Sequence, residues 1–392
     1  MQGIRTTSLD SIYYYIQRYA LKDGGKIKRK GFISLVRLAE LGAGIHAHEQ
    51  TLSGPKADRL RLMQACNANL SPIFSLYSDP RLAVNRLLDA AADKGRPVVD
   101  VEDDNGVENI IWRVDDADII REVSALMAGK ALFIADGHHR YETALNYRNL
   151  MREKNPHPTG LEPYNYVMMY FSNMDSEGMT IWPTHRVIHG LAGFDGDNLL
   201  KECARYFDMQ EFRFAGADEP RAREAFLKGM EEAGRRTTAI GLHIRARNAY
   251  HVMTLKEKET GNLGAGIPEV FKSLDVTVLH SLILSKILGI TKEAQEKQTN
   301  IIYVKSHEEA LTPASSMRGQ APAAHPEAQA VFLLNPTRIE QVKAVAEAGL
   351  VMPQKSTYFY PKLLSGLVIN LMNEKIAAAS VKARPRKPKA GV

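Results

Sequence analysis

The chain has 392 residues, of which 44% are hydrophobic and 24% charged, the composition of a folded protein with two or three domains. Residues 381–392 carry five basic residues and no acid, and subtracting these five charges from the net charge of +6 leaves +1 for the rest. The near-neutral body excludes a bulk electrostatic attraction for nucleic acid, and the proline-interrupted basic end predicts a disordered tail.

Cysteines and apolar segments exclude two further classes of protein. The two cysteines, Cys66 and Cys203, do not form a CxxC pair, so neither a disulfide framework nor a thiolate zinc site is expected. No run of about 18 apolar residues occurs, and the N-terminus lacks the apolar core of a signal peptide. We therefore expect a cytoplasmic protein that does not span a membrane.

Residues 1–155 alternate between strand-like and helix-like segments. Aromatic and β-branched runs predict the strands, and helical spacing of apolar residues predicts the helices. The turn residues at 104–106 indicate a hairpin, and the acidic run at 115–118 offers a helix N-cap. The expected elements are strands at 12–19, 31–38, 73–77 and 131–134, helices at 56–69, 81–93, 117–128 and 139–153, and a hairpin over 96–114.

The second part of the chain continues this irregular alternation. The expected elements are a hairpin of strands at 165–172 and 179–188, helices at 197–209, 219–234, 275–289, 337–348 and 363–379, strands within 237–256 and at 300–305 and 329–334, and a linker at 313–326. Irregular alternation with hairpins favours an α+β fold with mixed sheets over a doubly wound parallel sheet. Domain boundaries are indicated near 155–163 or 261–267.

The segment Asp-Gly-His-His-Arg at residues 136–140 is the strongest local signal. A buried strand ends there, Gly137 permits a tight turn, and a helix begins whose first N–H groups have no partner within the helix. These groups attract phosphate, and His138, His139 and Arg140 add donors. Asp136 is suited to cap the helix, to hold Mg²⁺ or to orient a histidine. The alternative is an N-capped helix with polar surface histidines.

A second polar segment, residues 46–51, follows a strand and two glycines. Glu49 is a candidate general base, and His48 is placed to orient it or to neutralise its charge. The alternative is a solvated connector. A zincin helix is excluded, because Leu52 stands where the HExxH motif needs its second histidine.

Two segments mimic nucleotide-binding motifs, and we reject both. Residues 42–47 resemble a dinucleotide fingerprint, but no helix follows at once and no acidic residue ends a second strand at the right distance. Residues 349–356 resemble a P-loop, but Gln354 replaces the second glycine and the segment follows a helix.

Two aromatic segments are candidates for pocket walls. Residues 355–362 combine two lysines, two hydroxyls and three aromatics, which suits either a ligand pocket or a packed aromatic loop. Residues 182–186 could form a substrate wall that ends in Arg186, although a structural role is favoured there. His185 and His189 have the spacing of helical metal ligands, but their neighbours predict a strand.

Taken together, several of these segments resemble one family, domain-of-unknown-function family 1015, in the ParB/sulfiredoxin-like superfamily. The resemblance covers most of residues 30–373 and implies a mixed-sheet ParB/sulfiredoxin-like core at 1–160. An accessory α/β region at 161–380 would complete the pocket. Members of the family usually carry a longer N-terminal region, so a truncated N-terminus is expected here. The similar motifs lie, in the family's order, at residues 48–51, 54–60, 71–74, 134–144 and 352–362.

The superfamily includes kinases that phosphorylate free serine, and the resemblance implies a related activity. The expected function is transfer of a phosphoryl group from ATP or ADP, with Mg²⁺, to a small hydroxyl metabolite, with free L-serine as the expected substrate. The roles mapped onto this chain are catalysis by Glu49, Asp136 and His139; phosphate or nucleotide binding by Gly137, His138, His139, Arg140, Thr51, Lys355 and Ser356; substrate binding by His48 and Arg186; and Mg²⁺ binding by Asp136.

Two other functions stay open at this stage. A metal-dependent hydrolase would use His46, His48, Asp136, His138 and His139 as ligands. A non-catalytic ParB-like switch would bind nucleotide and use the basic tail to contact DNA. The expected partners are a nucleotide and a small-molecule substrate. Neither nucleic acid nor a membrane is expected, and a homodimer stays open.

Overall fold

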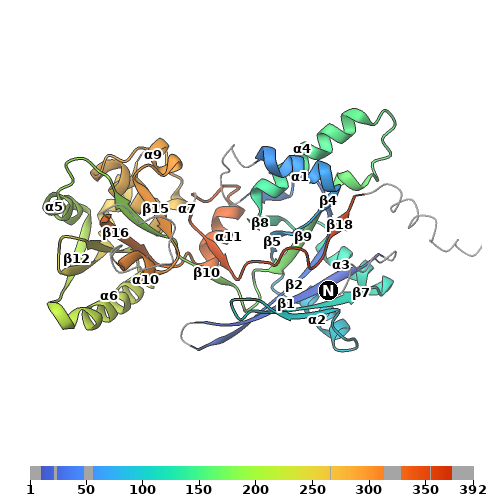
Figure 1. The fold of residues 1–392 in the computed structure, drawn as a ribbon, viewed down its shortest axis with the longest axis horizontal. Coiled ribbons are helices and arrows are strands. Elements are labelled where there is room, and N and C mark those ends of the chain that lie inside the picture. Colours follow the sequence, from blue (N-terminus) through green and yellow to red (C-terminus); the bar gives the residue numbers. More distant parts are fainter. Residues whose placement is uncertain are drawn as a thin grey trace, which may run out of the picture. The chain divides into compact units, whose positions relative to one another are not determined.

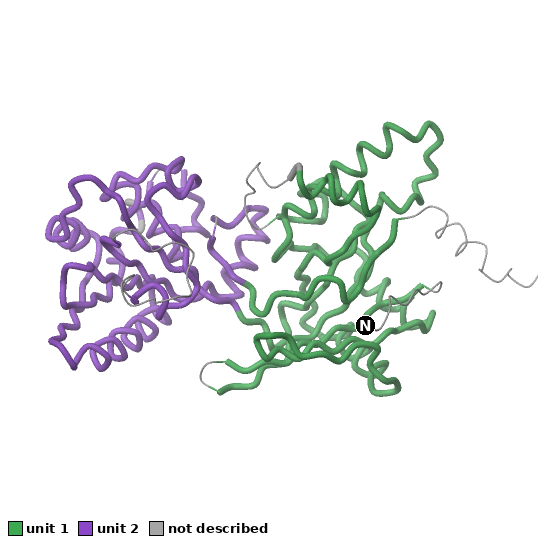
Figure 2. The backbone as a smooth tube through the Cα atoms, viewed as in Figure 1, with its two compact units in different colours: residues 1–180, 359–392 green, residues 181–358 purple. Residues whose placement is uncertain are grey.

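The computed structural model describes residues 10–21, 24–47, 56–264, 266–312, 328–353 and 355–372. The chain forms two compact units (Figure 2): unit 1 contains Met1–Thr180 and Phe359–Val392, and unit 2 contains Ile181–Tyr358. Unit 1 is therefore built from two separate stretches of sequence. The expected boundary between residues 160 and 161 lies inside unit 1. The chain passes from one unit to the other after Thr180 and again after Tyr358.

Unit 1 contains a mixed sheet of eight described strands (Figure 1). Across the sheet they are β3 (Ile45–Ala47), β8 (Leu132–Asp136), β5 (Ile73–Tyr77), β9 (Tyr166–Asn173), β2 (Lys26–Arg37), β1 (Ile12–Ala20), β7 (Glu108–Val114) and β6 (Val99–Glu102). The pairs β3–β8 and β5–β9 are parallel, and the other neighbours are antiparallel. The expected α+β class with a mixed sheet is confirmed.

Helices of unit 1 pack in pairs. In Figure 1, α1 lies beside α4 and α2 beside α3. Side chains from these helices and from the strands, among them Tyr14, Leu88, Val123, Ile134 and Tyr141, share one hydrophobic core. The bounds are α1 (Lys56–Cys66), α2 (Ala83–Ala92), α3 (Ala117–Met127), α4 (His138–Lys154) and the short η1 (Pro163–Asn165), with β4 (Ala68–Asn69) paired to β18 (Asn370–Leu371).

Two local signals in the sequence explain how the chain turns around β7. Before the strand, the Asp103 carboxylate accepts the N–H groups of Asn105 and Val107 and closes the β6–β7 turn. After it, Asp116 caps α3 by accepting the N–H groups of Asp118 and Ile119. Both the hairpin and the N-cap are confirmed.

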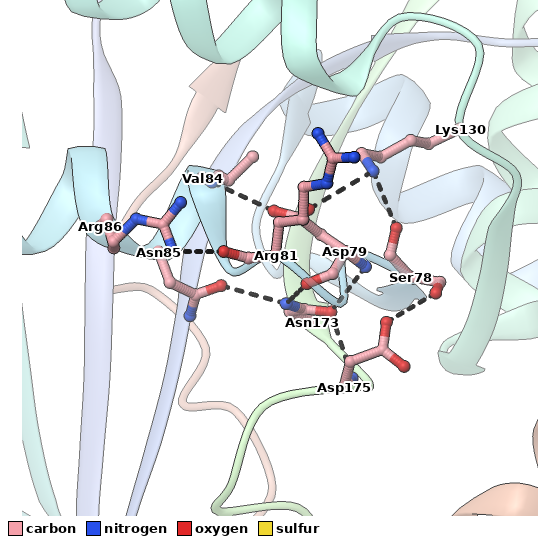
Figure 3. A network of polar contacts seen from close by, with 9 residues as sticks. All are labelled: Ser78, Asp79, Arg81, Val84, Asn85, Arg86, Lys130, Asn173 and Asp175. Carbon is pink, nitrogen blue, oxygen red and sulfur yellow. Dashed lines mark hydrogen bonds and ion pairs between the residues drawn. The ribbon is translucent and has the colours of Figure 1, made fainter.

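A polar network closes the end of the sheet at which β5 and β9 finish (Figure 3). The Asn173 side chain accepts the Asp79 N–H at 3.0 Å and donates to the Asp79 carbonyl at 2.8 Å. Lys130, which precedes β8, donates to the Ser78 carbonyl at 2.8 Å. Because β8 runs antiparallel to β5, this network lies at the opposite end of β8 from Asp136.

Unit 2 contains an antiparallel sheet of six described strands. Its strand pairs are all antiparallel, and buried residues such as Ile240, Phe332 and Leu334 form its core with the surrounding helices. Across the sheet the strands are β12 (Phe207–Arg213), β14 (Ala249–Leu255), β13 (Ala239–Ile244), β16 (Ala328–Leu334), β11 (His185–His189) and β15 (Ile301–Val304).

One pair of short strands lies outside this second sheet. The strands β10 (Thr180–Trp182) and β17 (Tyr358–Tyr360) pair with each other where the chain passes between the units.

No helix in the described ranges combines the length and apolar character that a membrane span needs. The helices of unit 2 are α5 (Gly196–Tyr206), η2 (Gly216–Asp218), α6 (Glu219–Gly234), η3 (Glu257–Leu263), α7 (Glu269–Lys272), α8 (Asp275–Val278), the π-helical η4 (Leu279–Ile287), α9 (Lys292–Lys297), α10 (His307–Leu311) and α11 (Ile339–Glu347).

Two expected elements are wrong, and one ends earlier than expected. The strands at 165–172 and 179–188 do not form a hairpin, because β9 joins the sheet of unit 1 and β11 joins that of unit 2. The helix expected over 197–209 ends at Tyr206, and the chain continues as β12. Residues 363–372 are not helical and contain β18. The rest of that expected helix, the linker at 313–326 and the basic tail at 381–392 lie outside the described residues.

Candidate functional site

A sharp turn joins β8 to α4. Asp136 ends β8 opposite Phe74 of β5, Gly137 follows with a φ of +99°, and α4 begins at His138. This φ is unfavourable for a residue that has a Cβ atom. A Cβ on Gly137 would also lie 2.8 Å from the Arg140 Nε and Nη2 atoms. Glycine therefore suits the turn and leaves room for the Arg140 guanidinium.

Helix α4 begins without a capping side chain at its N-cap, because that residue is Gly137. The first N–H groups of a helix carry partial positive charge and have no partner inside the helix. Since α4 is 17 residues long, its aligned peptide dipoles add to this charge. The turn therefore offers backbone donors to an anion.

Asp136 is held between two cations, Arg140 on the same turn and Lys362 from a distant part of the sequence. Its Oδ2 accepts a hydrogen bond from Arg140 Nη2 at 2.6 Å, and its Oδ1 accepts one from Lys362 Nζ at 2.8 Å. Burial acts to raise the pKa of Asp136, but Lys362 and then Arg140 outweigh burial and hold the pKa below its usual value. The carboxylate is therefore ionised at neutral pH and orients both cations.

The backbone around Lys362 is fixed by a buried arginine on β2. Arg29 is 1% exposed and donates to the Tyr360 carbonyl at 3.1 Å and to the Pro361 carbonyl at 2.5 Å. Its guanidinium also lies over the Phe74 ring, 4.8 Å from the centroid. Gln17 of β1 donates to the Lys362 carbonyl at 3.1 Å. These contacts set the direction from which Lys362 reaches Asp136.

The described groups that act on Asp136 and Arg140 include more cations than carboxylates. Arg59 on α1 lies close enough to Arg140 to act on it electrostatically. Burial lowers the pKa of Arg140, Asp136 opposes that effect and Arg59 adds to it, but a guanidinium stays protonated at any physiological pH. Among the described residues, Arg140 and Lys362 both bond to the Asp136 carboxylate, and Arg59 lies near Arg140. An anion placed here would find charge that Asp136 alone does not balance.

Both histidines of the expected site belong to the first turn of α4. His138 is 9% exposed and lies close enough to Asp136 to lower the pKa of that carboxyl further. The carbonyl of His139 accepts a hydrogen bond from the Thr143 hydroxyl at 2.6 Å. The structure thus brings together Asp136, Gly137, His138, His139 and Arg140 in one turn.

The other expected site residues fall into two groups. Glu49, His48 and Thr51 lie outside the described residues, so their roles stay predictions. Lys355, Ser356 and Arg186 belong to unit 2.

Arg186 has a structural setting within unit 2. It is fully buried and donates to the Lys355 carbonyl at 3.1 Å, and it lies 3.1 Å from the His280 ring nitrogen. The expected strand around His185 and His189 is confirmed as β11, which rules out the helical spacing of metal ligands there.

Mg²⁺ binding by Asp136 stays a prediction, and the described residues offer no metal site of their own. Mg²⁺ prefers carboxylate oxygens and water, whereas both oxygens of Asp136 already accept hydrogen bonds from cations. Among the described residues, no group of three or more His, Cys, Asp or Glu could hold a metal ion. His46, a proposed ligand of the hydrolase alternative, stacks on Phe133 with ring centroids 5.3 Å apart.

Sequence reasoning missed part of this site. Lys362 was included only as a member of the segment 355–362, and neither Arg59 nor Arg29 received a role. Arg59 lies in the motif at 54–60, which was a usable signal. Arg29 sits among lysines in a strand that reads as solvent-exposed, so only the structure shows that it is buried.

Comparisons with solved structures give distant likenesses. A conserved hypothetical protein from Pyrococcus furiosus is 13% identical, with 88% of this chain and 97% of that chain covered and a TM-score of 0.38. C-terminally truncated SbnI from Staphylococcus aureus is 12% identical, with 89% and 92% covered and a TM-score of 0.39. A mutant free serine kinase in complex with AMP is 12% identical, with 83% and 87% covered and a TM-score of 0.39. At this level of similarity they assign no activity to this chain.

Comparison with curated proteins finds no match. One family model does match, over residues 3–277, and its description is "Protein of unknown function (DUF1015)". The match spans well over half of the chain, and it agrees with the motifs at 54–60, 71–74 and 134–144. The chain belongs to the DUF1015 family.

Proposed function

We propose that this protein is a nucleotide-dependent phosphotransferase that binds phosphate groups at the turn from Asp136 to Arg140 and transfers one to a small hydroxyl metabolite, with free L-serine as the substrate to test first. The observation that carries the proposal is the arrangement of Arg140 and Lys362 around the Asp136 carboxylate at the N-terminus of α4, with Arg59 near Arg140. Phosphate is the common biological anion that combines high charge with several acceptor oxygens, which suits backbone N–H groups and guanidinium donors together.

Each residue of the turn has a separate part in the proposal. Gly137 lets phosphate oxygens approach the first N–H groups of α4, where a side chain would intervene. Arg140 and Lys362 neutralise the phosphate charge, and His138 and His139 supply ring donors. Asp136 holds the two cations in place before the nucleotide binds, so little reorganisation is needed when charge develops.

The transfer requires a base as well as a phosphate site. The oxygen of the substrate hydroxyl forms a bond to the terminal phosphorus, the bond from that phosphorus to the bridging oxygen breaks, and the shortened nucleotide leaves. The hydroxyl proton passes to a carboxylate, for which we propose Glu49. General base catalysis of this kind contributes about 10²–10⁴ in rate. Thr51 and His48, from the same segment, are proposed nucleotide and substrate contacts.

The hydrogen bonds of Asp136 to Arg140 and Lys362 support a positioning role for its carboxylate. Each carboxylate oxygen accepts one of these bonds and keeps a second lone pair, so both cations could stay in place if Mg²⁺ binds there with the nucleotide. The metal-dependent hydrolase gains no support from the described residues, and no structural observation favours the DNA-binding switch.

Incubation of the full-length protein with L-serine and either ATP or ADP tests the proposal, with phosphoserine measured as the product. The wild-type protein should form phosphoserine, and Glu49→Gln should lower turnover by about 10²–10⁴ while nucleotide binding is retained. Unchanged turnover in Glu49→Gln would remove Glu49 as the base. If nucleotide binds and no phosphoryl group reaches serine or other small hydroxyl compounds, the phosphotransferase proposal is overturned and only the binding site stands.

A further inference from the structure

Unit 2 contains a cavity of its own, which the proposed function does not use. Its volume is about 830 Å³, within the range typical of small-molecule sites. It lies at the end of the sheet where β16 finishes at Leu334 and where β11 and β13 begin. The last turn of α6 and the first turns of α7, α8 and α11 complete its wall.

One carboxylate lies on the inner wall of this cavity. Asp275, the first residue of α8, accepts a weak hydrogen bond from Asn335 Nδ2 at 3.5 Å. Burial raises the pKa of Asp275 to about 7, although the Asn335 side chain, then Arg338, and backbone hydrogen bonds from Ala239 and Asn335 act to lower it. An ionised Asp275 therefore lacks enough compensating charge from the protein itself. A bound cation would provide that charge.

Asn335 is fixed in position beside this acid. Its Nδ2 also donates to the Ala239 carbonyl at 3.1 Å and to the Met230 carbonyl at 3.4 Å. Gly234 permits this packing, since a Cβ there would lie 2.3 Å from the same nitrogen. The inner wall is thus a built polar surface that is ordered before any ligand binds.

The mouth of the cavity carries the opposite charge. Arg235 and Lys272 are already compensated by Glu231 and Glu269, each at 2.6 Å. Within the described residues, Arg236 and Arg338 form no ion pair within 4 Å, although both are exposed at the cavity. A ligand would therefore meet two guanidinium groups outside and one carboxylate inside.

Between these ends, the wall is partly apolar. Met230, Leu255, Val276 and Leu334 are buried residues that line the cavity, and Leu227 is half-buried. Apolar groups of a ligand would lose contact with water here, which favours binding by about 25 cal/mol for each Å² removed from solvent.

We propose that this cavity binds a zwitterion with an apolar side chain, an amino acid or a short peptide, through its ammonium group at Asp275 and its carboxylate at Arg236 and Arg338. The charges of such a ligand match those of the two ends, and its side chain matches the wall between them. The inference does not depend on the proposed phosphotransferase activity, because ligands without a hydroxyl group suffice for this site.

Calorimetric titration of the full-length protein distinguishes a free amino acid from a short peptide as the ligand. L-leucine represents the amino acids, and L-leucyl-L-leucine represents the peptides. The matched probes are 4-methylpentanoate, which lacks the ammonium group, and 3-methylbutylamine, which lacks the carboxylate. At least one zwitterion should bind at least about tenfold more tightly than both matched probes, a difference of about 1.4 kcal/mol. Equal binding of all four probes, or no binding of either zwitterion, overturns the proposal.

Two variants and a control localise the site. Asp275→Asn and Arg236→Gln should each weaken binding of the zwitterion about tenfold or more, whereas Asp208→Asn on the exposed face of β12 should not change it. Arg236 is exposed, so its variant keeps the test decisive even if Asp275→Asn does not fold. Unchanged affinity in Arg236→Gln contradicts the assignment.

Binding should also depend on pH. Because the ammonium group needs an ionised Asp275, affinity should fall about tenfold between pH 8 and pH 6. Asp275→Asn should remove this dependence. A dependence that survives in that variant would belong to other titrating groups and would contradict the role of Asp275. The titratable and charged groups around the cavity are His185 of β11, Glu231, Arg235 and Arg236 after α6, Glu269 and Lys272 of α7, His307 of α10 and Arg338 before α11.

Discussion

At the scale of single residues, the candidate phosphate site depends on Gly137. Its φ of +99° disfavours a side chain, and a Cβ there would displace the Arg140 guanidinium, which is a separate physical reason. Glycines with positive φ are common in this chain, so the backbone alone does not mark a functional position. The contact distinguishes Gly137 from glycines that merely turn the chain.

Substitution of Gly137 by alanine separates these two reasons. Gly137→Ala should lower the free energy of unfolding by about 1–2 kcal/mol through backbone strain and should also weaken ADP binding, because Arg140 must move. Gly129→Ala is the matched control, since Gly129 has a φ of +78° and open space around its missing Cβ. Urea unfolding and calorimetry measure both effects. Equal loss of ADP affinity in the two variants would contradict the role of the Arg140 contact.

The buried side chain of His243 should make the unfolding free energy of unit 2 depend on pH. Burial lowers the pKa of His243 to about 4, although a hydrogen bond to the Ala249 carbonyl opposes this effect. The ring is therefore neutral in the folded protein at pH values above about 4. A group with a lowered folded-state pKa stabilises the fold fully above its unfolded pKa of about 6.5, and this stability is lost as pH falls toward 4. The loss should be on the order of 3 kcal/mol.

The variant His243→Phe tests this dependence. It keeps an aromatic ring beside Tyr250 and removes the titration, so the decrease in unfolding free energy between pH 7 and pH 4.5 should be smaller. His251, whose pKa is also lowered by burial, should account for part of the remainder. An unchanged decrease in the variant would contradict the assignment to His243.

At the scale of elements, the sequence predicted features that depend on neighbouring residues better than it predicted which strands pair. The strand–glycine–helix pattern at 131–153, the β6–β7 hairpin and the Asp116 cap each depend on residues close in sequence, and all three are confirmed. The hairpin expected at 165–188 is wrong because β9 pairs with β2 and β5, which are distant in sequence. Partner choice of this kind depends on long-range packing, which periodicity does not encode.

Arg29 shows how one element can control another. Replacing it by Met should remove the hydrogen bonds that Arg29 donates to the Tyr360 and Pro361 carbonyls and lower the unfolding free energy on the order of 3 kcal/mol. Lys362 should then lose its fixed direction, and ADP affinity should fall. Arg18→Met on β1 is the control, because Arg18 is half exposed and its ion pair with Glu108 lies on the surface. Wild-type ADP affinity in a folded Arg29→Met protein would contradict this positioning role.

At the scale of the whole molecule, the site combines segments that the sequence separates. Asp136 and Lys362 meet in unit 1, although all of unit 2 lies between them in the chain. The sequence indicated the turn at 136–140 and, separately, the segment 355–362, but no local pattern shows that one end of that segment reaches the turn. The same separation explains why Lys355 and Ser356 fall in unit 2 while Lys362 falls in unit 1.

Titration of ADP into the full-length protein and into Lys362→Met tests most directly whether the turn binds phosphate. Lys154→Met is the matched control, because it removes an exposed lysine from the other end of α4. The wild-type protein and Lys154→Met should bind ADP equally, and Lys362→Met should bind it at least about tenfold more weakly, a loss of about 1.4 kcal/mol. Equal affinity in all three proteins, or no binding to the wild type, would contradict a phosphate site at Asp136–Arg140.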